Sequence, residues 1–113
     1  MSDAFAYGLS RMTLDYLASV FRKHSQIQQV LIFGSRAQGT YTPYSDIDLA
    51  VCAPDLTAAE FAAIVQELAD LPLIYKLDCL HLDTMRNSSF RNRIMETGKP
   101  FWGASVPNPT KKS

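Results

Sequence analysis

Residues 30–52 read VLIFGSRAQGTYTPYSDIDLAVC, and this stretch decides the fold. The run 30–33 is short and apolar and is followed by glycine, which predicts a buried strand. Gly, Ser, Thr and Pro dominate residues 34–45, so a loop with room for one helical turn is expected there. Apolar side chains alternate along 46–53, which predicts a second strand with one buried face. Two core strands interrupted by a polar loop are therefore expected at the centre of the domain.

Helical patterns surround these two strands. Apolar residues recur three and four positions apart from Ser10 to His24 and again over 58–71, where Thr57 and Glu60 match a capping box. The remaining expected elements are a strand over 73–82, a short helix that is capped by Asn87 or Ser88 and stops at Gly98, and a last strand at 101–102. This order predicts an α/β (α+β) fold with a small mixed β-sheet and flanking helices.

Composition limits the class of protein. With 113 residues, 47% of them hydrophobic, the chain is long enough for one domain with a real core, expected over 1–103. Residues 104–113 hold two prolines and two lysines without periodicity, which predicts a flexible tail. Eleven Lys plus Arg balance eleven Asp plus Glu, so direct binding of nucleic acid is not expected. Since neither a membrane helix nor a signal peptide is visible, we expect a soluble cytoplasmic protein whose Cys52 and Cys79 are buried free thiols.

Three carboxylates and a glycine near the predicted strand ends indicate chemistry. Asp46 and Asp48 lie two residues apart on one strand, so their side chains share a face. Asp78 stands in apolar company on a later strand, where a carboxylate needs a partner or a metal ion to offset its desolvation. Gly34 lets the backbone approach a phosphate closely, and the Ser35 hydroxyl can donate to that phosphate. The set predicts phosphoryl-transfer chemistry with two Mg²⁺ ions held by Asp46, Asp48 and Asp78.

Simpler interpretations stand beside this one. An Asp-x-Asp at a strand start can be a turn cap with a solvated neighbour. Lys76 can be the ion-pair partner of Asp78, or it can touch a triphosphate. Arg36 can contact a phosphate from the loop or simply be solvated in an exposed turn. A P-loop is excluded, because the Lys and the Ser or Thr of that motif are replaced by Thr40 and Tyr41.

Two segments together resemble a known family. FGSRAQG at 33–39 and YSDIDLAV at 44–51 resemble the signature of the minimal nucleotidyltransferases, within the DNA polymerase β-like superfamily. YKLD at 75–78 resembles the segment that bears the family's third carboxylate, and the ending 90–102 is also similar. The resemblance covers most of the chain and implies the polymerase β-like nucleotidyltransferase fold.

The resemblance also implies an activity. A nucleoside monophosphate would be transferred from a nucleoside triphosphate, ATP in the leading hypothesis, to an acceptor hydroxyl with release of pyrophosphate. Asp46 and Asp48 would hold Mg²⁺, and Asp78 would be both the third ligand and the base. The nucleotide would be bound by Gly34, Ser35, Arg36, Ser45 and Lys76.

A partner follows from the same resemblance. Nucleotidyltransferases of this size are encoded with a small HEPN-domain protein, and the pair forms a toxin–antitoxin system. The chain would then be the antitoxin that adds AMP to a tyrosine of the HEPN ribonuclease toxin. A homodimer is a further expected assembly, because aromatic side chains near Phe101 and Trp102 are expected to be exposed. Binding to membranes is not expected.

Three other functions remain open at this point. A binding-only antitoxin of the same fold would neutralise its partner by forming a stoichiometric complex. Transfer to a small molecule such as an antibiotic would use the same chemistry but would need further walls around that ligand. A dehalogenase-like phosphatase would use Asp46 as a nucleophile, yet Ala50 and Val51 follow where that motif needs a hydroxyl.

Overall fold

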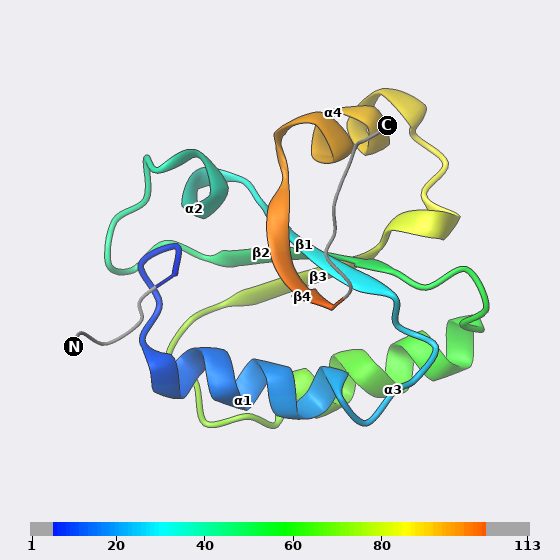
Figure 1. Ribbon diagram of the computed structural model, residues 1–113, viewed down its shortest axis with the longest axis horizontal. Coiled ribbons are helices and arrows are strands. Elements are labelled where there is room, and N and C mark those ends of the chain that lie inside the picture. The colour runs from blue at the N-terminus through cyan, green and yellow to red at the C-terminus, as the bar shows by residue number, and fades with distance from the viewer. Residues whose placement is uncertain (1–5, 104–113) are drawn as a thin grey trace.

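The computed structural model of the chain describes residues 6–103. The elements follow one another as α1 (Arg11–Phe21), β1 (Gln29–Phe33), α2 (Ser35–Gln38), β2 (Ile47–Cys52), α3 (Ala58–Ala69), β3 (Leu77–His81), the 3₁₀ turn η1 (Leu82–Thr84), α4 (Ser88–Thr97) and β4 (Lys99–Gly103). They form three layers, with α1 and α3 against one face of a sheet and α4 against the other (Figure 1). The tail expected at 104–113 lies outside the described residues.

The four strands form one mixed sheet in the order β3-β2-β1-β4. β1 pairs antiparallel with both β2 and β4, while β2 pairs parallel with β3. A parallel neighbour requires a crossover connection, and α3 supplies it between β2 and β3. The small mixed sheet predicted from the sequence is confirmed.

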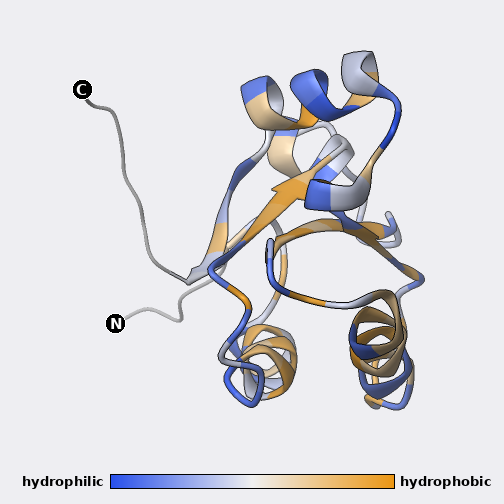
Figure 2. Ribbon diagram, turned by 90° about the vertical axis from the view of Figure 1, so that its right-hand side faces the viewer, coloured by the Kyte–Doolittle hydropathy of each residue, from blue (hydrophilic) through white to orange (hydrophobic). Residues whose placement is uncertain are grey.

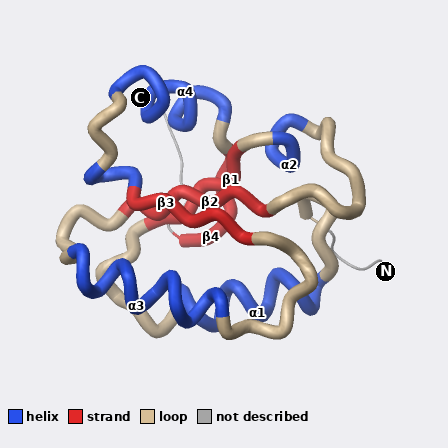
Figure 3. Tube along the Cα trace, turned by 180° about the vertical axis from the view of Figure 1, so that it is seen from behind, coloured by secondary structure: helices blue, strands red, loops and turns tan. Residues whose placement is uncertain are grey.

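The main core lies between the sheet and the pair α1 and α3. Ile47, Leu49 and Val51 are fully buried, because these alternate residues of β2 point toward the two helices. Figures 2 and 3 show α1 and α3 side by side beneath this face. The opposite face carries a smaller cluster around Ala50 and Ile94, and it is this thinner side that leaves polar residues accessible.

Helix ends follow the local chemistry that their sequences predict. The Ser10 hydroxyl caps α1 by accepting a hydrogen bond from the Thr13 backbone N–H. Thr57 and Glu60 form the expected capping box at the start of α3. Asn87, the first of the two residues expected to cap the last helix, accepts from the backbone N–H of Phe90. α1 ends at Phe21 and α3 at Ala69, a few residues before the ends expected at His24 and at residue 71.

The expected strand 73–82 is wrong at both ends. β3 begins only at Leu77, because its partner β2 begins at Ile47 and no neighbouring strand pairs with residues 73–76. Ile74 is consequently 84% exposed despite its apolar side chain. Leu82 begins a 3₁₀ turn instead of continuing the strand. Apolar character alone therefore did not make a strand where a hydrogen-bonding partner was missing.

Both cysteines are free and partly buried. Burial raises the pKa of the Cys52 thiol to about 11 and that of the Cys79 thiol to about 12. Repulsion from Asp83 adds to the effect at Cys52. Both thiols are therefore protonated at neutral pH and poor nucleophiles.

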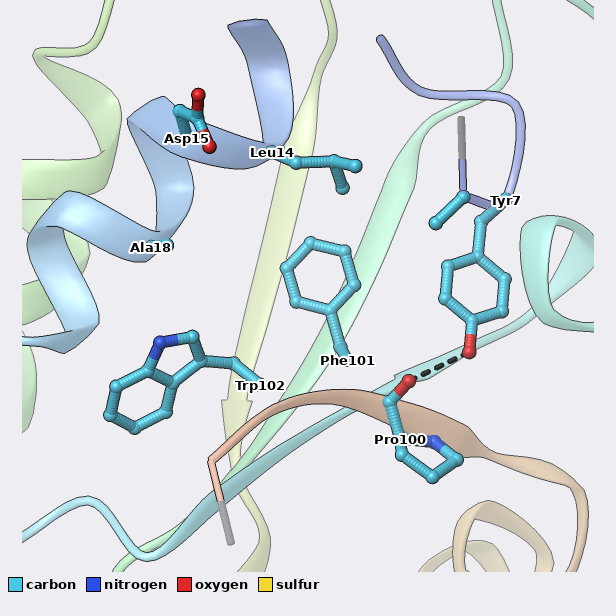
Figure 4. Close-up of a pocket in the computed structure, with 8 residues that line it drawn as sticks. Tyr7, Leu14, Asp15, Ala18, Pro100, Phe101 and Trp102 are labelled. Carbon is cyan, nitrogen blue, oxygen red and sulfur yellow. Dashed lines mark hydrogen bonds between the residues drawn. The ribbon is translucent and has the colours of Figure 1, made fainter. Parts of the chain in front are cut away.

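An apolar cavity of ≈ 350 Å³ lies between α1 and β4 (Figure 4). Its walls include Leu14, Phe101 and Trp102, and the Tyr7 hydroxyl donates a 2.7 Å hydrogen bond to the Pro100 carbonyl at its edge. Phe101 and Trp102 are half-buried and pack against the core, so the exposed position expected for them is wrong. No helix within residues 6–103 has the length and apolar composition that a membrane crossing requires.

Candidate functional site

The sheet register brings Asp48 and Asp78 together. Asp48 on β2 is paired with Asp78 on the parallel strand β3, and residues in register on neighbouring strands direct their side chains to the same face. Asp48 shares the face of Ala50, which is opposite the face that packs on α1 and α3. Asp46 immediately precedes β2 and is exposed. The two strand starts therefore form one acidic corner on the thinly covered side of the sheet.

Burial and charge repulsion disfavour ionisation of Asp48. The pKa of this carboxyl is raised above 3.8, chiefly by partial burial and then by repulsion from Asp78 and Asp46. Lys76, exposed just before β3, acts in the opposite direction and lowers the pKa. A divalent cation placed at this corner would relieve the repulsion.

Asp78 itself is exposed, which corrects one expectation. Its apolar neighbours in the sequence suggested a desolvated carboxylate that needed a partner. Leu77 and Cys79 instead point to the core face, while Asp78 points to the open face of an edge strand. The significance of Asp78 therefore lies in its position beside Asp48 and not in burial.

Carboxylate oxygens suit a hard cation such as Mg²⁺, which completes its shell with water and phosphate oxygens. Asp48 and Asp78 fit this requirement, since they are in register and share a face. Within the described part of the chain, no group of three or more His, Cys, Asp or Glu side chains lies close enough together to hold one ion. The structure thus assembles a pair of the three predicted ligands, with Asp46 near enough to repel Asp48.

Gly34 fits tightly against Asp48. It has φ 75° and ψ −155°, a backbone conformation open essentially to glycine alone. A Cβ atom at this position would collide with the Asp48 carboxylate oxygen Oδ2. The close approach arises because Phe33, the preceding residue, is in register with Asp48. Ser35 then begins the single turn of α2, so the loop that was expected to cradle phosphate starts beside the acidic corner.

Gly34→Ala is expected to displace Asp48 and to cost about 2 kcal/mol of folding free energy through backbone strain and the collision. The nucleotidyl transfer that the resemblance implies should fall about 100-fold, because a displacement of about 1 Å in a reacting group has that effect. Gly39→Ala is the matched control: Gly39 also has positive φ, 81°, but a Cβ there would meet nothing within 4 Å. Urea unfolding and transfer rates on both variants check this. Equal loss of activity in the two would contradict it.

Arg36 is buried, which corrects the expectation of an exposed turn residue. Only 1% of it is exposed, and its guanidinium donates to backbone carbonyls. It donates to Tyr7 at 2.9 Å, to Ser45 at 3.0 and 3.3 Å, and to Pro43 at 3.4 Å. Because these donors point into the protein, the guanidinium supports the loop and does not face a phosphate.

Two tyrosines enclose the same guanidinium. Its central carbon lies 5.2 Å from the centroid of the Tyr41 ring and 5.0 Å from that of Tyr75. Arg36 therefore joins the loop before Asp46 to the segment before β3. The sequence reasoning missed Tyr7 and Tyr75 as supports of the site, because they come from distant segments with no shared local pattern.

Ser45 and Lys76 lie at the edges of this corner. The Ser45 hydroxyl accepts a 2.8 Å hydrogen bond from the Thr42 backbone N–H, so it shapes the loop. The Lys76 side chain is exposed, and its carbonyl accepts from the Ile47 backbone N–H. Nucleotide contacts by Ser45 and Lys76 stay predictions.

Comparison with known proteins assigns the chain to a family. The family described as "Polymerase beta, Nucleotidyltransferase" matches residues 15–105. No curated protein matches the chain. The fold also resembles that of a toxin–antitoxin crystallised with AMP-PNP, with a TM-score of 0.65 and 29% identity over 80% of this chain and 73% of that one.

Two further structures are similar. A complex described as a tri-AMPylated Shewanella oneidensis HEPN toxin with MNT antitoxin gives a TM-score of 0.62 and 26% identity over 83% of this chain and 72% of that one. An MntA-HepT toxin–antitoxin structure, 24% identical with a TM-score of 0.61 over 84% and 74% of the two chains, supports the fold alone. These similarities agree with the resemblance to minimal nucleotidyltransferases. Since the family match spans most of the chain, the protein belongs to the polymerase beta nucleotidyltransferase family.

Proposed function

We propose that the protein is an antitoxin that transfers AMP from ATP to a hydroxyl, specifically a tyrosine, of a HEPN-domain toxin. The acidic pair Asp48 and Asp78 beside the strained glycine Gly34 is the observation that carries this proposal. Family membership supports nucleotidyl transfer in general. The similar complexes support the partner and the nucleotide, since one was crystallised with AMP-PNP and another holds a tri-AMPylated HEPN toxin.

Each residue of the corner has a defined task in this proposal. Asp48 and Asp78, with Asp46 from the loop, would hold Mg²⁺, and a bound ion would neutralise phosphate charge during the displacement. The backbone at Gly34 and the Ser35 hydroxyl would contact phosphate oxygens. Lys76 and the Ser45 segment would border the nucleotide. The occupancy by two ions, the possibility of a homodimer and the cytoplasmic location stay predictions.

The proposed reaction is an in-line displacement at phosphorus. The acceptor oxygen forms a bond to the α-phosphorus of ATP, and the bond from that phosphorus to the bridging oxygen breaks. Pyrophosphate leaves with the electron pair. The proton of the hydroxyl passes to the Asp78 carboxylate, whose exposure on the open face lets an incoming protein side chain reach it.

Intact-mass spectrometry of the HEPN protein that is encoded beside this chain tests the proposal. The HEPN protein is incubated with the full chain, ATP and Mg²⁺, and the Asp46→Asn, Asp48→Asn double variant is the control. We expect one or more AMP groups on the HEPN protein, absent with the control. An unchanged mass in a stable complex, with the toxin still neutralised, would contradict the chemistry and favour a binding-only antitoxin.

A further inference from the structure

Phe33 and Phe90, which we name the aromatic pair, lie next to the acidic corner. Phe33 ends β1 immediately before Gly34 and is in register with Asp48 on the antiparallel strand β2. Residues directly opposite each other in an antiparallel pair place their side chains on the same face. The Phe33 ring therefore lies on the face of Asp48, within one strand spacing of it.

Phe90 reaches the same place from a different layer. It is in the first turn of α4, and its ring meets that of Phe33 edge to face, with centroids 6.1 Å apart and an interplanar angle of 81°. The Asn87 side chain accepts the Phe90 backbone N–H at 3.0 Å, which fixes this turn of the helix. Figures 1 and 3 show α2 and α4 on the same side of the sheet, away from α1 and α3.

The aromatic pair is only partly covered by the rest of the protein. Phe33 is half-buried and Phe90 is 39% exposed, while Ile94, one turn further along α4, is fully packed. An exposed aromatic ring forfeits the stabilisation that burial would provide. An exposed aromatic ring beside a charged corner is the arrangement found where a ligand has an apolar part and a few fixed polar groups.

We propose that the aromatic pair holds the base of the donor nucleotide. This inference rests on the proposed function and deepens it, because it assigns the part of ATP that the acidic corner does not bind. In a nucleotide, only the ribose lies between the phosphates and the base. Asp48 and Phe33 are directly opposite each other on neighbouring strands, so a nucleotide whose phosphates lie at Asp48 has its base close to the aromatic pair. The base lies against the exposed ring of Phe90. Stacking recognises the π-face that every base has, so the pair favours binding without selecting one base strictly.

The acceptor tyrosine is the competing occupant, since it also presents an aromatic face. The base and the acceptor tyrosine would bind at different steps of the reaction. A base contributes to nucleotide affinity before any acceptor is bound, whereas an acceptor ring contributes only to transfer. Inorganic tripolyphosphate distinguishes the contribution of the base to affinity from that of the phosphates, because it carries the charge of ATP without ribose or base.

The test measures affinity for Mg-ATP and for Mg-tripolyphosphate by calorimetry, on the full chain alone and in complex with its HEPN partner. Phe90→Leu keeps the apolar volume but removes the π-face, and Phe90→Tyr restores it. Met95→Ala is the control, because Met95 is on the same helix and 61% exposed. Thermal unfolding of each variant verifies that α4 is intact.

We expect Phe90→Leu to weaken ATP binding about tenfold, the effect of losing one stacked base. Its affinity for tripolyphosphate should change less than about twofold, and Phe90→Tyr and Met95→Ala should bind ATP like the wild type. Unchanged ATP affinity in Phe90→Leu with slower transfer would overturn the inference and assign the pair to the acceptor. A wild type that binds both ligands equally overturns the inference alone, and one that binds neither overturns the proposed function as well.

Discussion

Replacing Asp48 by Asn is expected to abolish most transfer and yet to stabilise the metal-free protein. Transfer should fall by roughly three orders of magnitude, because the variant loses a carboxylate that the proposal assigns to holding Mg²⁺ beside the phosphates. Stability should rise because the amide removes a charge that partial burial, Asp78 and Asp46 all disfavour. The gain should stay below about 1 kcal/mol, since Asp48 is only partly buried and solvent screens the repulsion.

The sign of the pH dependence follows from the raised pKa of Asp48. A carboxyl whose pKa is higher in the folded than in the unfolded protein stabilises the fold when protonated. That stability is fully present below about pH 3.8 and is lost as the pH rises through the raised folded value. The ionised Asp48 therefore destabilises the wild type at pH 7. The difference in unfolding free energy between the wild type and Asp48→Asn should vanish near pH 3.

Chemical unfolding in EDTA at pH 7 and pH 3 measures this difference, and transfer is assayed separately with Mg²⁺. Asp55→Asn is the control, because Asp55 is an exposed aspartate in the turn after β2. Added Mg²⁺ should raise the unfolding midpoint of the wild type more than that of Asp48→Asn, since a ligand stabilises the state that binds it. Asp48→Asn losing both stability and activity would show that Asp48 supports the fold instead.

The sequence predicted the elements whose causes are local. The apolar run before Gly34 and the alternation after Asp46 became β1 and β2, and the Thr57 capping box begins α3. The acidic set could also be predicted, because Asp46 and Asp48 are close in sequence and Asp78 is distinctive in its strand. These features need only the alternation of strand side chains and the chemistry of helix ends.

The features that could not be predicted depend on distant contacts. Ile74 lies in an apolar run but is exposed, because β2 begins only at Ile47, which is paired with Leu77, and no strand reaches Ile74. The pairing of Phe33 with Phe90 joins a strand end to a helix in another layer. No local pattern encodes where two segments meet, so these positions required the assembled sheet.

Arg36 is the clearest example of a feature that depends on distant contacts, and its replacement has the largest expected effect on stability. Arg36→Ala should lower the free energy of unfolding by about 3–5 kcal/mol. The variant removes a guanidinium that is 1% exposed and leaves three backbone carbonyls, those of Tyr7, Pro43 and Ser45, without their donor. It also removes the cation that lies between the rings of Tyr41 and Tyr75.

A lysine at position 36 is not expected to restore the stability that the arginine provides. Arg36→Lys retains the charge, but a single ammonium cannot reach all three carbonyls with the planar geometry of a guanidinium. We expect it to lose at least half as much stability as Arg36→Ala. Arg86→Ala is the matched control, because Arg86 is exposed, and its effect should stay within about 0.5 kcal/mol.

The segments that lose protection in the Arg36 variants show which part of the protein Arg36 supports. Arg36 holds the Ser45 carbonyl, and Ser45 directly precedes Asp46, so the loop should loosen where it delivers that carboxylate. Hydrogen exchange should therefore increase across 40–46 and at Tyr75 while β1 and β2 stay protected. A variant with wild-type stability and exchange but weak ATP binding would assign the guanidinium to the nucleotide. The observed burial instead makes it the support that keeps the acidic corner assembled.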